Sequence, residues 1–106
     1  MNAFYEKVYQ IVEQIPSGKV VSYGQIAAMA GNPLAARAAG AAMRNTPEYL
    51  DIPCHRVVNQ SGGIAPGYAF GGSGKQRELL ENEGVVFKEN GCIDMKRCQW
   101  KVQTLK

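Results

Sequence analysis

Residues 22–44 read SYGQIAAMAGNPLAARAAGAAMR and contain two short helical patterns that are separated by a turn. Ser22 lies three residues before Gln25, which is the spacing of a capping box, so we expect a helix to begin just after Ser22. This helix is predicted over residues 23–30, because Gly31 follows it as a typical stop.

The second half of this stretch predicts another helix. Asn32 suits the N-cap and Pro33 suits the first helical position, so the helix is expected to run from there to about Arg44. Six alanines and Gly40 leave it with almost no side-chain bulk, and Arg37 is the only long charged side chain in its first two turns. A thin helix can approach either a neighbouring helix or a nucleic-acid backbone closely. The pair is therefore a helix-turn-helix candidate.

The other predicted elements are short and follow from periodicity and turn residues. They are an amphipathic helix over 3–15, extended segments at 20–21 and 57–58, a helix over 75–83, and a hairpin over 85–95 that turns at Asn90 and Gly91. We therefore expect one domain over residues 1–106, mainly α-helical with small β elements.

Composition narrows the class of protein. The chain has 106 residues, a mass of 11.5 kDa, 45% hydrophobic residues and 20% charged residues, which is typical of one folded domain. It shows no signal-peptide pattern and no apolar run long enough for a membrane span, so we expect a cytoplasmic protein, nucleoid-associated if bacterial. Cys54, Cys92 and Cys98 form no CxxC pair, so neither a disulfide framework nor a metal site is expected.

The charge distribution favours an anionic partner. No acidic residue lies between Glu13 and Glu48, whereas Lys19, Arg37 and Arg44 fall in that segment, and the net charge is +3. A segment of one sign is consistent with binding to a polyanion such as DNA. An ordinary solvated surface is the alternative.

The densest chemical feature is Pro53-Cys54-His55-Arg56. A cysteine beside the only histidine of the chain is a candidate nucleophile with its base. Neighbouring side chains of an extended strand point to opposite faces, so Cys54 and His55 need a turn or a bridging water to exchange a proton. A buried inert thiol is the alternative.

Several motifs, in this order, resemble the C-terminal domain of O6-alkylguanine-DNA alkyltransferases. They are GKVVSYGQIAAMAGNP at 18–33, ARAAG at 36–40, IPCHRVV at 52–58, GY at 67–68 and LLENEG at 79–84. The resemblance extends from about Phe4 to Phe87, and the tail from Lys88 onward has no place in it. It implies a winged-helix-like helix-turn-helix domain without a cofactor or metal.

The resemblance also implies a self-inactivating repair reaction. Cys54 matches the acceptor that takes the alkyl group from the guanine oxygen and keeps it as a thioether. His55 matches the base that deprotonates Cys54 through a water, and Glu83 matches the carboxylate that orients His55. From the sequence alone, Glu83 is equally compatible with an ordinary helix-end carboxylate.

For DNA, the resemblance implies a monomer that binds double-stranded DNA containing O6-alkylguanine through the minor groove and flips the damaged base. Arg37 matches the residue that fills the vacated stack, and Tyr23 matches the one that crowds the 3′ phosphate. Met43 lines the base pocket, and Tyr68 donates to a ring nitrogen of guanine. The remaining contacts are expected from Asn45 to the substrate and from Ala36, Gly40 and Arg44 to DNA.

Other roles for some of these residues stay open. Tyr23 is also suited to packing on Phe4, and Arg37 to solvation at the surface. The family often closes its recognition helix with Asn-Pro, whereas this chain has Asn45-Thr46-Pro47, so either Asn45 or Thr46 ties that turn. Ala69 stands where a serine is common.

Three functions compete at this point. The first is the alkyl-accepting enzyme. The second is an alkyltransferase-like protein that binds the lesion without transfer and signals to other repair pathways. Such relatives usually lack the acceptor cysteine, so Cys54 favours the enzyme, whereas the small size of the chain and the Asn45-Thr46-Pro47 turn favour the binder. The third is a transcriptional helix-turn-helix module, which leaves Pro53-Cys54-His55-Arg56 without a role.

Overall fold

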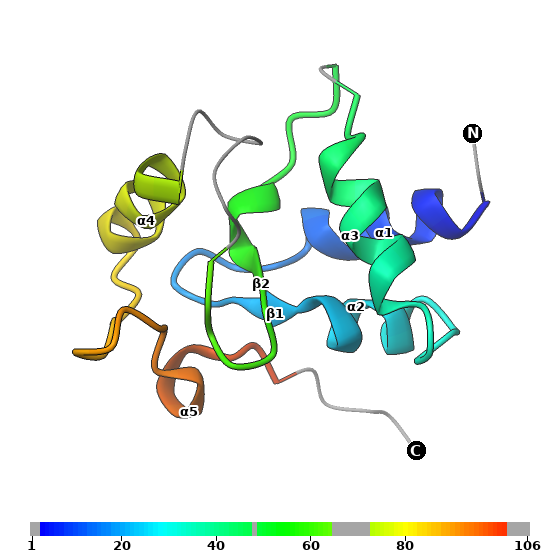
Figure 1. Cartoon of the computed structure of the whole chain (residues 1–106). Coiled ribbons are helices and arrows are strands. Elements are labelled where there is room, and N and C mark those ends of the chain that lie inside the picture. The colour runs from blue at the N-terminus through cyan, green and yellow to red at the C-terminus, as the bar shows by residue number, and fades with distance from the viewer. Residues whose placement is uncertain (1–2, 48, 65–72, 102–106) are drawn as a thin grey trace.

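The computed structural model of the chain describes residues 3–47, 49–64 and 73–101. The described part is mainly helical with a small sheet, as the sequence predicts (Figure 1). Its elements, in chain order, are α1 (Ala3–Glu13), β1 (Val21–Ser22), α2 (Tyr23–Met29), α3 (Ala36–Arg44), the 3-10 turn η1 (Cys54–Arg56), β2 (Val57–Val58), α4 (Ser73–Asn82) and α5 (Met95–Cys98).

The start of α2 agrees with the sequence prediction. Ser22 has an extended backbone, and its hydroxyl accepts a hydrogen bond from the Gln25 backbone N–H at 3.0 Å. The Gln25 side chain does not complete the capping box, because its amide donates to the Trp100 carbonyl at 2.6 Å instead. Gln25 thus ties the helix-turn-helix to the end of the described chain.

The start of α3 differs from the prediction. The helix begins at Ala36 rather than at Pro33, because Asn32 caps a tight turn and not the helix. The Asn32 side-chain oxygen accepts from the Leu34 N–H at 3.2 Å, and the Asn32 carbonyl accepts from the Ala35 N–H at 3.0 Å. Asparagine followed by proline is as suitable for a β-turn as for a helix start, and here the turn forms.

One core cluster lies between the first three helices and η1. Its fully buried members include Ile15, Ile26, Val8 and Val12, and Ala39, Ala42 and Met43 face them from α3. The small side chains of α3 therefore serve close helix packing on the inner face. Figure 1 shows these helices on one side of the sheet and α4 on the other.

The two strands and the tail enclose a second, smaller core cluster. β1 pairs with β2 in parallel, with Val21 opposite Val57, and Val20 forms a further parallel bridge with Gln99. The cluster consists of Val20, Val58, Leu80, Val85, Ile93 and Cys98. The tail that had no place in the resemblance thus covers the outer edge of β1.

Residues 85–95 form a minimal version of the predicted hairpin. Phe87 and Ile93 make one antiparallel bridge, and Gly91 adopts φ 87° in the turn. Gly62 packs against this hairpin, because its carbonyl accepts from the Ile93 N–H at 2.9 Å. A Cβ at Gly62 would lie 2.5 Å from the Ile93 oxygen, and φ there is 91°, so the contact requires glycine.

No helix in the described ranges is both long and apolar enough to cross a membrane.

Candidate active site

The Pro53-Cys54-His55-Arg56 motif folds into the turn that the sequence analysis called for. Cys54 to Arg56 form η1, in which the Val57 N–H donates to the Cys54 carbonyl and the Arg56 N–H donates to the Pro53 carbonyl. A 3-10 turn fans successive side chains around its axis instead of alternating them. Cys54 is therefore directed into the first core cluster, while His55 and Arg56 reach toward the end of α4.

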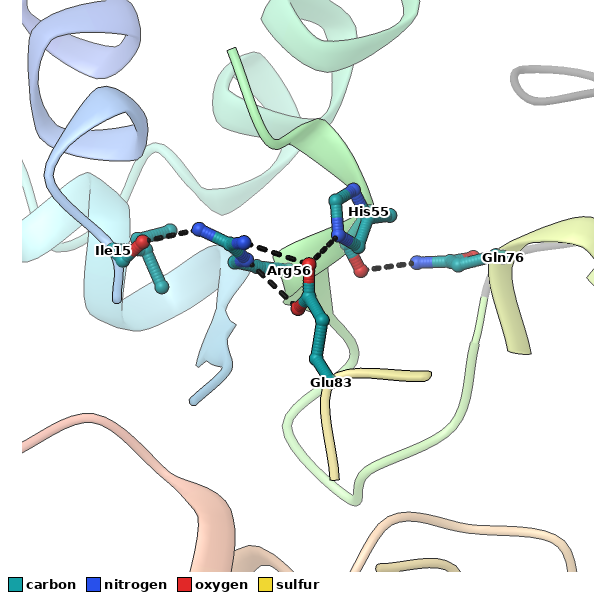
Figure 2. Close-up of polar contacts among 5 residues, drawn as sticks. All are labelled: Ile15, His55, Arg56, Gln76 and Glu83. Carbon is teal, nitrogen blue, oxygen red and sulfur yellow. Dashed lines mark hydrogen bonds and ion pairs between the residues drawn. The ribbon is translucent and has the colours of Figure 1, made fainter. Parts of the chain in front are cut away.

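Glu83, the residue that follows α4, accepts hydrogen bonds from both His55 and Arg56 of η1 (Figure 2). Arg56 binds it in a bidentate manner, with Nε 2.9 Å from Oε1 and Nη2 2.6 Å from Oε2, and His55 Nε2 lies 2.8 Å from Oε2. Burial alone would raise the pKa of Glu83, but the hydrogen bonds from Arg56 and His55 outweigh it and lower that pKa to about 2. Glu83 is thus an anion at neutral pH.

The ionised state of Glu83 determines the tautomer of His55. A carboxylate can only accept, so His55 Nε2 must carry the proton of the 2.8 Å hydrogen bond. In neutral His55 the other ring nitrogen, Nδ1, then has a free lone pair, and Figure 2 shows it on the side of the ring away from Glu83. Glu83 therefore orients the His55 ring so that Nδ1 points away from the carboxylate.

Arg56 joins three parts of the chain at this point. Besides its bonds to Glu83, its Nη1 donates to the Ile15 carbonyl at 2.6 Å, just after α1. Its side chain is only 16% exposed, so the guanidinium depends on these partners for its solvation. Arg56 thereby fixes the ends of α1 and α4 relative to η1 (Figure 2).

Gln76 holds the backbone of the same turn from α4. Its side-chain amide donates to the carbonyls of His55 at 3.0 Å and Val57 at 3.3 Å, and the residue is 1% exposed. Its Oε1 is buried without a hydrogen-bond partner among the described residues. Gln76 thus supports the position of His55 through the main chain.

Cys54 lies in a different environment from His55. It is 8% exposed, and its sulfur lies 3.3 Å from the Thr46 hydroxyl oxygen. Burial raises the pKa of the Cys54 thiol, although the hydrogen bonds from Thr46 and the Cys54 backbone act in the opposite direction. Within the described ranges no hydrogen bond joins Cys54 to His55 directly.

The outer face of α3 carries the predicted DNA-contacting cations. Arg37 and Arg44 are exposed and lie seven residues apart, which places them on the same helix face. Ala36 and Gly40 lie partly exposed near them, and a Cβ built on Gly40 would lie 3.9 Å from the Tyr23 ring. The outward face of α3 is thus small and positively charged.

The expected base-pocket residues have mixed positions. Met43 is buried in the same core cluster as Cys54, and Tyr23 is half-buried against that cluster, as is Phe4. Asn45 is exposed, and its amide donates to the Ala41 carbonyl at 2.9 Å, closing the end of α3. Tyr68 lies outside the described residues, as does Ala69.

Three contacts of the site were not predicted from the sequence: Thr46 with Cys54, Arg56 with Glu83, and Gln76 with the backbone of η1. Arg56 belongs to the IPCHRVV motif, and this membership was a signal that could have marked it as a site residue. Gln76 had none, because a glutamine in a polar helix normally faces solvent. The described residues contain no cluster of three or more histidine, cysteine or acidic side chains that would hold a metal ion.

The sequence is similar to those of several known proteins. The chain is 43% identical over 88 residues to the methylated-DNA–protein-cysteine methyltransferase of Cricetulus griseus, covering 83% of this chain and 42% of that protein. It is 40% identical over 99 residues to the DNA base-flipping protein of Escherichia coli, covering 93% and 75%. It is 44% identical over 105 residues to alkyltransferase-like protein 1 of Schizosaccharomyces pombe, covering 95% and 97%.

The fold matches as well. The crystal structure of S. pombe Atl1 in complex with damaged DNA containing O6-carboxymethylguanine superposes with a TM-score of 0.82 at 38% identity, covering 96% of this chain and 98% of that one. The chain spans less than half the length of the Cricetulus griseus relative. Residues 3–85 match the family model described as the DNA-binding domain of 6-O-methylguanine DNA methyltransferase. The chain therefore belongs to the O6-methylguanine-DNA methyltransferase family.

Proposed function

We propose that this chain is a DNA repair protein that flips O6-alkylguanine out of duplex DNA and transfers the alkyl group irreversibly to Cys54. The observation that carries the proposal is the arrangement of His55 beside Cys54. Glu83 fixes the proton of His55 on Nε2, so Nδ1 is available to take a proton from the neighbouring residue through one water. The proposed nucleophile and base thus lie side by side in η1, and the proposed orienting carboxylate lies just after α4.

The proposed reaction is one displacement. His55 Nδ1 removes the Cys54 thiol proton through a water, and the thiolate attacks the alkyl carbon. A sulfur–carbon bond forms while the carbon–oxygen bond breaks, and its electron pair goes to the guanine oxygen. The guanine then takes up one proton, so the proton count balances and no cofactor is needed. The thioether on Cys54 has no route back to a thiol, which makes the reaction a single turnover.

The proposed partner is double-stranded DNA containing O6-alkylguanine, approached from the minor groove. The structural neighbour from S. pombe was solved with damaged DNA, and the outward face of α3 suits a narrow groove. Arg37 and Arg44 supply positive charge there, while Ala36 and Gly40 leave room for the backbone. Because a stacked guanine cannot reach a buried thiol, the base must be extruded, and Arg37 is the proposed occupant of the gap.

Contacts to the extruded base or its 3′ phosphate are proposed for four other residues. Tyr23, at the first position of α2, is proposed to act on the 3′ phosphate. Met43 shares the Cys54 cluster and is proposed to line the pocket for the base. Asn45 and Tyr68 complete the proposed set.

Intact-mass spectrometry tests the transfer. One equivalent of duplex DNA with a single O6-methylguanine should add about 14 Da to the protein, which is a methyl group in place of a proton. Cys54→Ser should bind the same DNA without gaining mass, and undamaged duplex should leave the wild-type mass unchanged. Tight lesion binding without any adduct on the wild-type protein would contradict the transfer.

The second candidate is an alkyltransferase-like lesion binder that signals to other repair pathways. It is supported by the match to S. pombe alkyltransferase-like protein 1 over nearly its full length, and by the buried, protonated Cys54 thiol. Binding of methylated duplex that is equal for wild type and Cys54→Ala, together with no mass gain over hours, would favour this function.

A further inference from the structure

The hydroxyl of Thr46 lies within hydrogen-bond distance of several groups but has only one proton to donate. Its oxygen lies 3.1 Å from the Ala42 carbonyl, 3.0 Å from the Met43 carbonyl and 3.3 Å from Cys54 Sγ. A threonine hydroxyl has one proton to donate and lone pairs to accept with, whereas a carbonyl can only accept. While the hydroxyl proton points to either carbonyl, the contact with Cys54 is a hydrogen bond only if the thiol is the donor.

The direction of this contact must reverse when Cys54 ionises. A thiolate can only accept, so Thr46 must then turn its proton from the carbonyls toward the sulfur. This rotation costs little at the end of α3, because the Ala42 carbonyl keeps the Tyr9 hydroxyl at 2.8 Å and the Asn45 N–H at 3.2 Å. The Met43 carbonyl keeps the Thr46 N–H at 3.5 Å. The local network therefore tolerates both positions of the proton.

We propose that Thr46 is a positioning residue for Cys54, whose hydroxyl accepts a hydrogen bond from the resting thiol and donates one to the thiolate. In the first state it directs the sulfur, and in the second it compensates for the water that a buried anion lacks. The part that this plays in alkyl transfer rests on the proposed function. The hydrogen bond itself does not depend on DNA.

The other groups around Cys54 do not supply the same donor. Tyr9 of α1 is buried in the core cluster of Cys54, with Tyr5 and Tyr23 packed against that cluster. The Tyr9 hydroxyl donates its one proton to Ala42, so its hydrogen bond with Thr46 has Thr46 as the donor. His55 adjoins Cys54 in η1, and its Nε2 is engaged with Glu83. The cations of α3, Arg37 and Arg44, are exposed on its outer face. Tyr49, on the segment that follows α3, is also exposed.

The test measures the alkylation rate of Cys54 by iodoacetamide against pH, with peptide mapping to separate it from Cys92 and Cys98. Thr46→Val removes the hydroxyl at nearly constant shape, and Thr46→Ser restores it. We expect the midpoint of the Thr46→Val profile to rise by about one to two pH units, and that of Thr46→Ser to stay near wild type. Thr46→Ala is the second hydroxyl-free variant if Thr46→Val does not fold.

Ser22→Ala is the control, because it removes the hydrogen bond that caps α2 and leaves the partners of Thr46 and of the sulfur in place. It should lower stability and leave the midpoint in place. An unchanged midpoint in the hydroxyl-free variants, or an equal shift in Thr46→Ser or Ser22→Ala, would overturn the proposal.

A measurement on the wild-type protein covers the resting state. The Raman difference spectrum between wild type and Cys54→Ser isolates the S–H stretch of Cys54. A donating thiol should give a band below the frequency of a free thiol, and a band at the free position would refute the resting hydrogen bond. Failure of methyl transfer from DNA with a normal thiol profile would count against the proposed function alone.

Discussion

Cys54 and His55 are neighbours in η1 but face two different environments, one beside α3 and one beside α4. The two environments shift the pKa values of their ionisable groups in opposite directions. On the side of α4, Glu83 is surrounded by donors from Arg56 and His55, and its pKa falls to about 2. On the side of α3, Cys54 is desolvated, has one side-chain contact with Thr46, and keeps a raised pKa. The two sides of η1 thus hold a carboxylate that is ionised at neutral pH and a thiol whose protonated form is favoured.

The Glu83 side of the site fixes the orientation of its side chains, whereas the Cys54 side holds the ionisable thiol. The Glu83 side is rigid, because three hydrogen bonds fix the carboxylate and a fourth fixes Arg56 to Ile15. The Cys54 side depends on groups whose protons can move. The predictions below test how strongly each side depends on its partners.

The largest effect is expected for Glu83→Ala. Removing the carboxylate leaves the half-buried Arg56 without its counter-ion and His55 without its orienting partner, so stability should fall by about 3–5 kcal/mol. Urea unfolding measures this loss. Glu81→Ala is the control, because Glu81 pairs with Arg77 in an exposed i,i+4 bridge and should cost less than about 0.5 kcal/mol. Equal losses in the two variants would show that the Glu83 network has no special stabilising role.

The second effect is the acid sensitivity of the fold. The pKa of Glu83 is depressed from 4.5 to about 2 in the folded state, so its stabilisation is present above pH 4.5 and is lost as the pH falls toward 2. This corresponds to about 3 kcal/mol. Urea unfolding of wild type and Glu83→Gln at several pH values isolates the contribution of Glu83. Parallel curves for the two proteins below pH 4.5 would contradict the depressed pKa.

A smaller effect is expected for Arg56→Lys. Lysine keeps the charge but cannot form the bidentate pair with Glu83 and also reach the Ile15 carbonyl, so about 1–3 kcal/mol of stability should be lost. The rate of transfer from methylated DNA should fall as well, since His55 shares the carboxylate. A variant with wild-type stability and rate would mean that only the charge of Arg56 matters.

The smallest effect on stability is expected for Arg37→Ala, because the side chain is exposed on α3 and should contribute within about 0.5 kcal/mol. Its effect should appear instead in binding, as a weaker preference for methylated over normal duplex. Competition binding with the two duplexes measures this preference. If affinity falls equally for both duplexes, Arg37 is a phosphate contact and not the occupant of the vacated stack.

Local patterns in the sequence predicted much of the fold. Periodic apolar residues located α1, the Ser22–Gln25 spacing located the start of α2, and Gly84 ended the helix that became α4, with φ 88°. The predicted start of α3 was wrong, because Asn32 and Pro33 are compatible with both a turn and a helix start. The short helix α5 was not predicted, since four residues carry too little periodicity.

Contacts between distant segments could not be predicted from local patterns. Trp100 donates from its backbone to Val20 at 2.7 Å, and Cys98 joins the second core cluster, yet nothing near residue 98 indicates either contact. The same holds for the site. Cys54 and His55 stand together in the motif, and the resemblance added Glu83, but the Thr46 contact depends on how α3 ends relative to η1.

Peptide mapping after a single exposure to methylated duplex tests whether Cys54 accepts the alkyl group. We expect one methyl group on the peptide that contains Cys54, while the peptides that contain Cys92 and Cys98 stay unmodified. An unmodified Cys54 in protein that holds the damaged duplex tightly, or a methyl group on another residue, would contradict it.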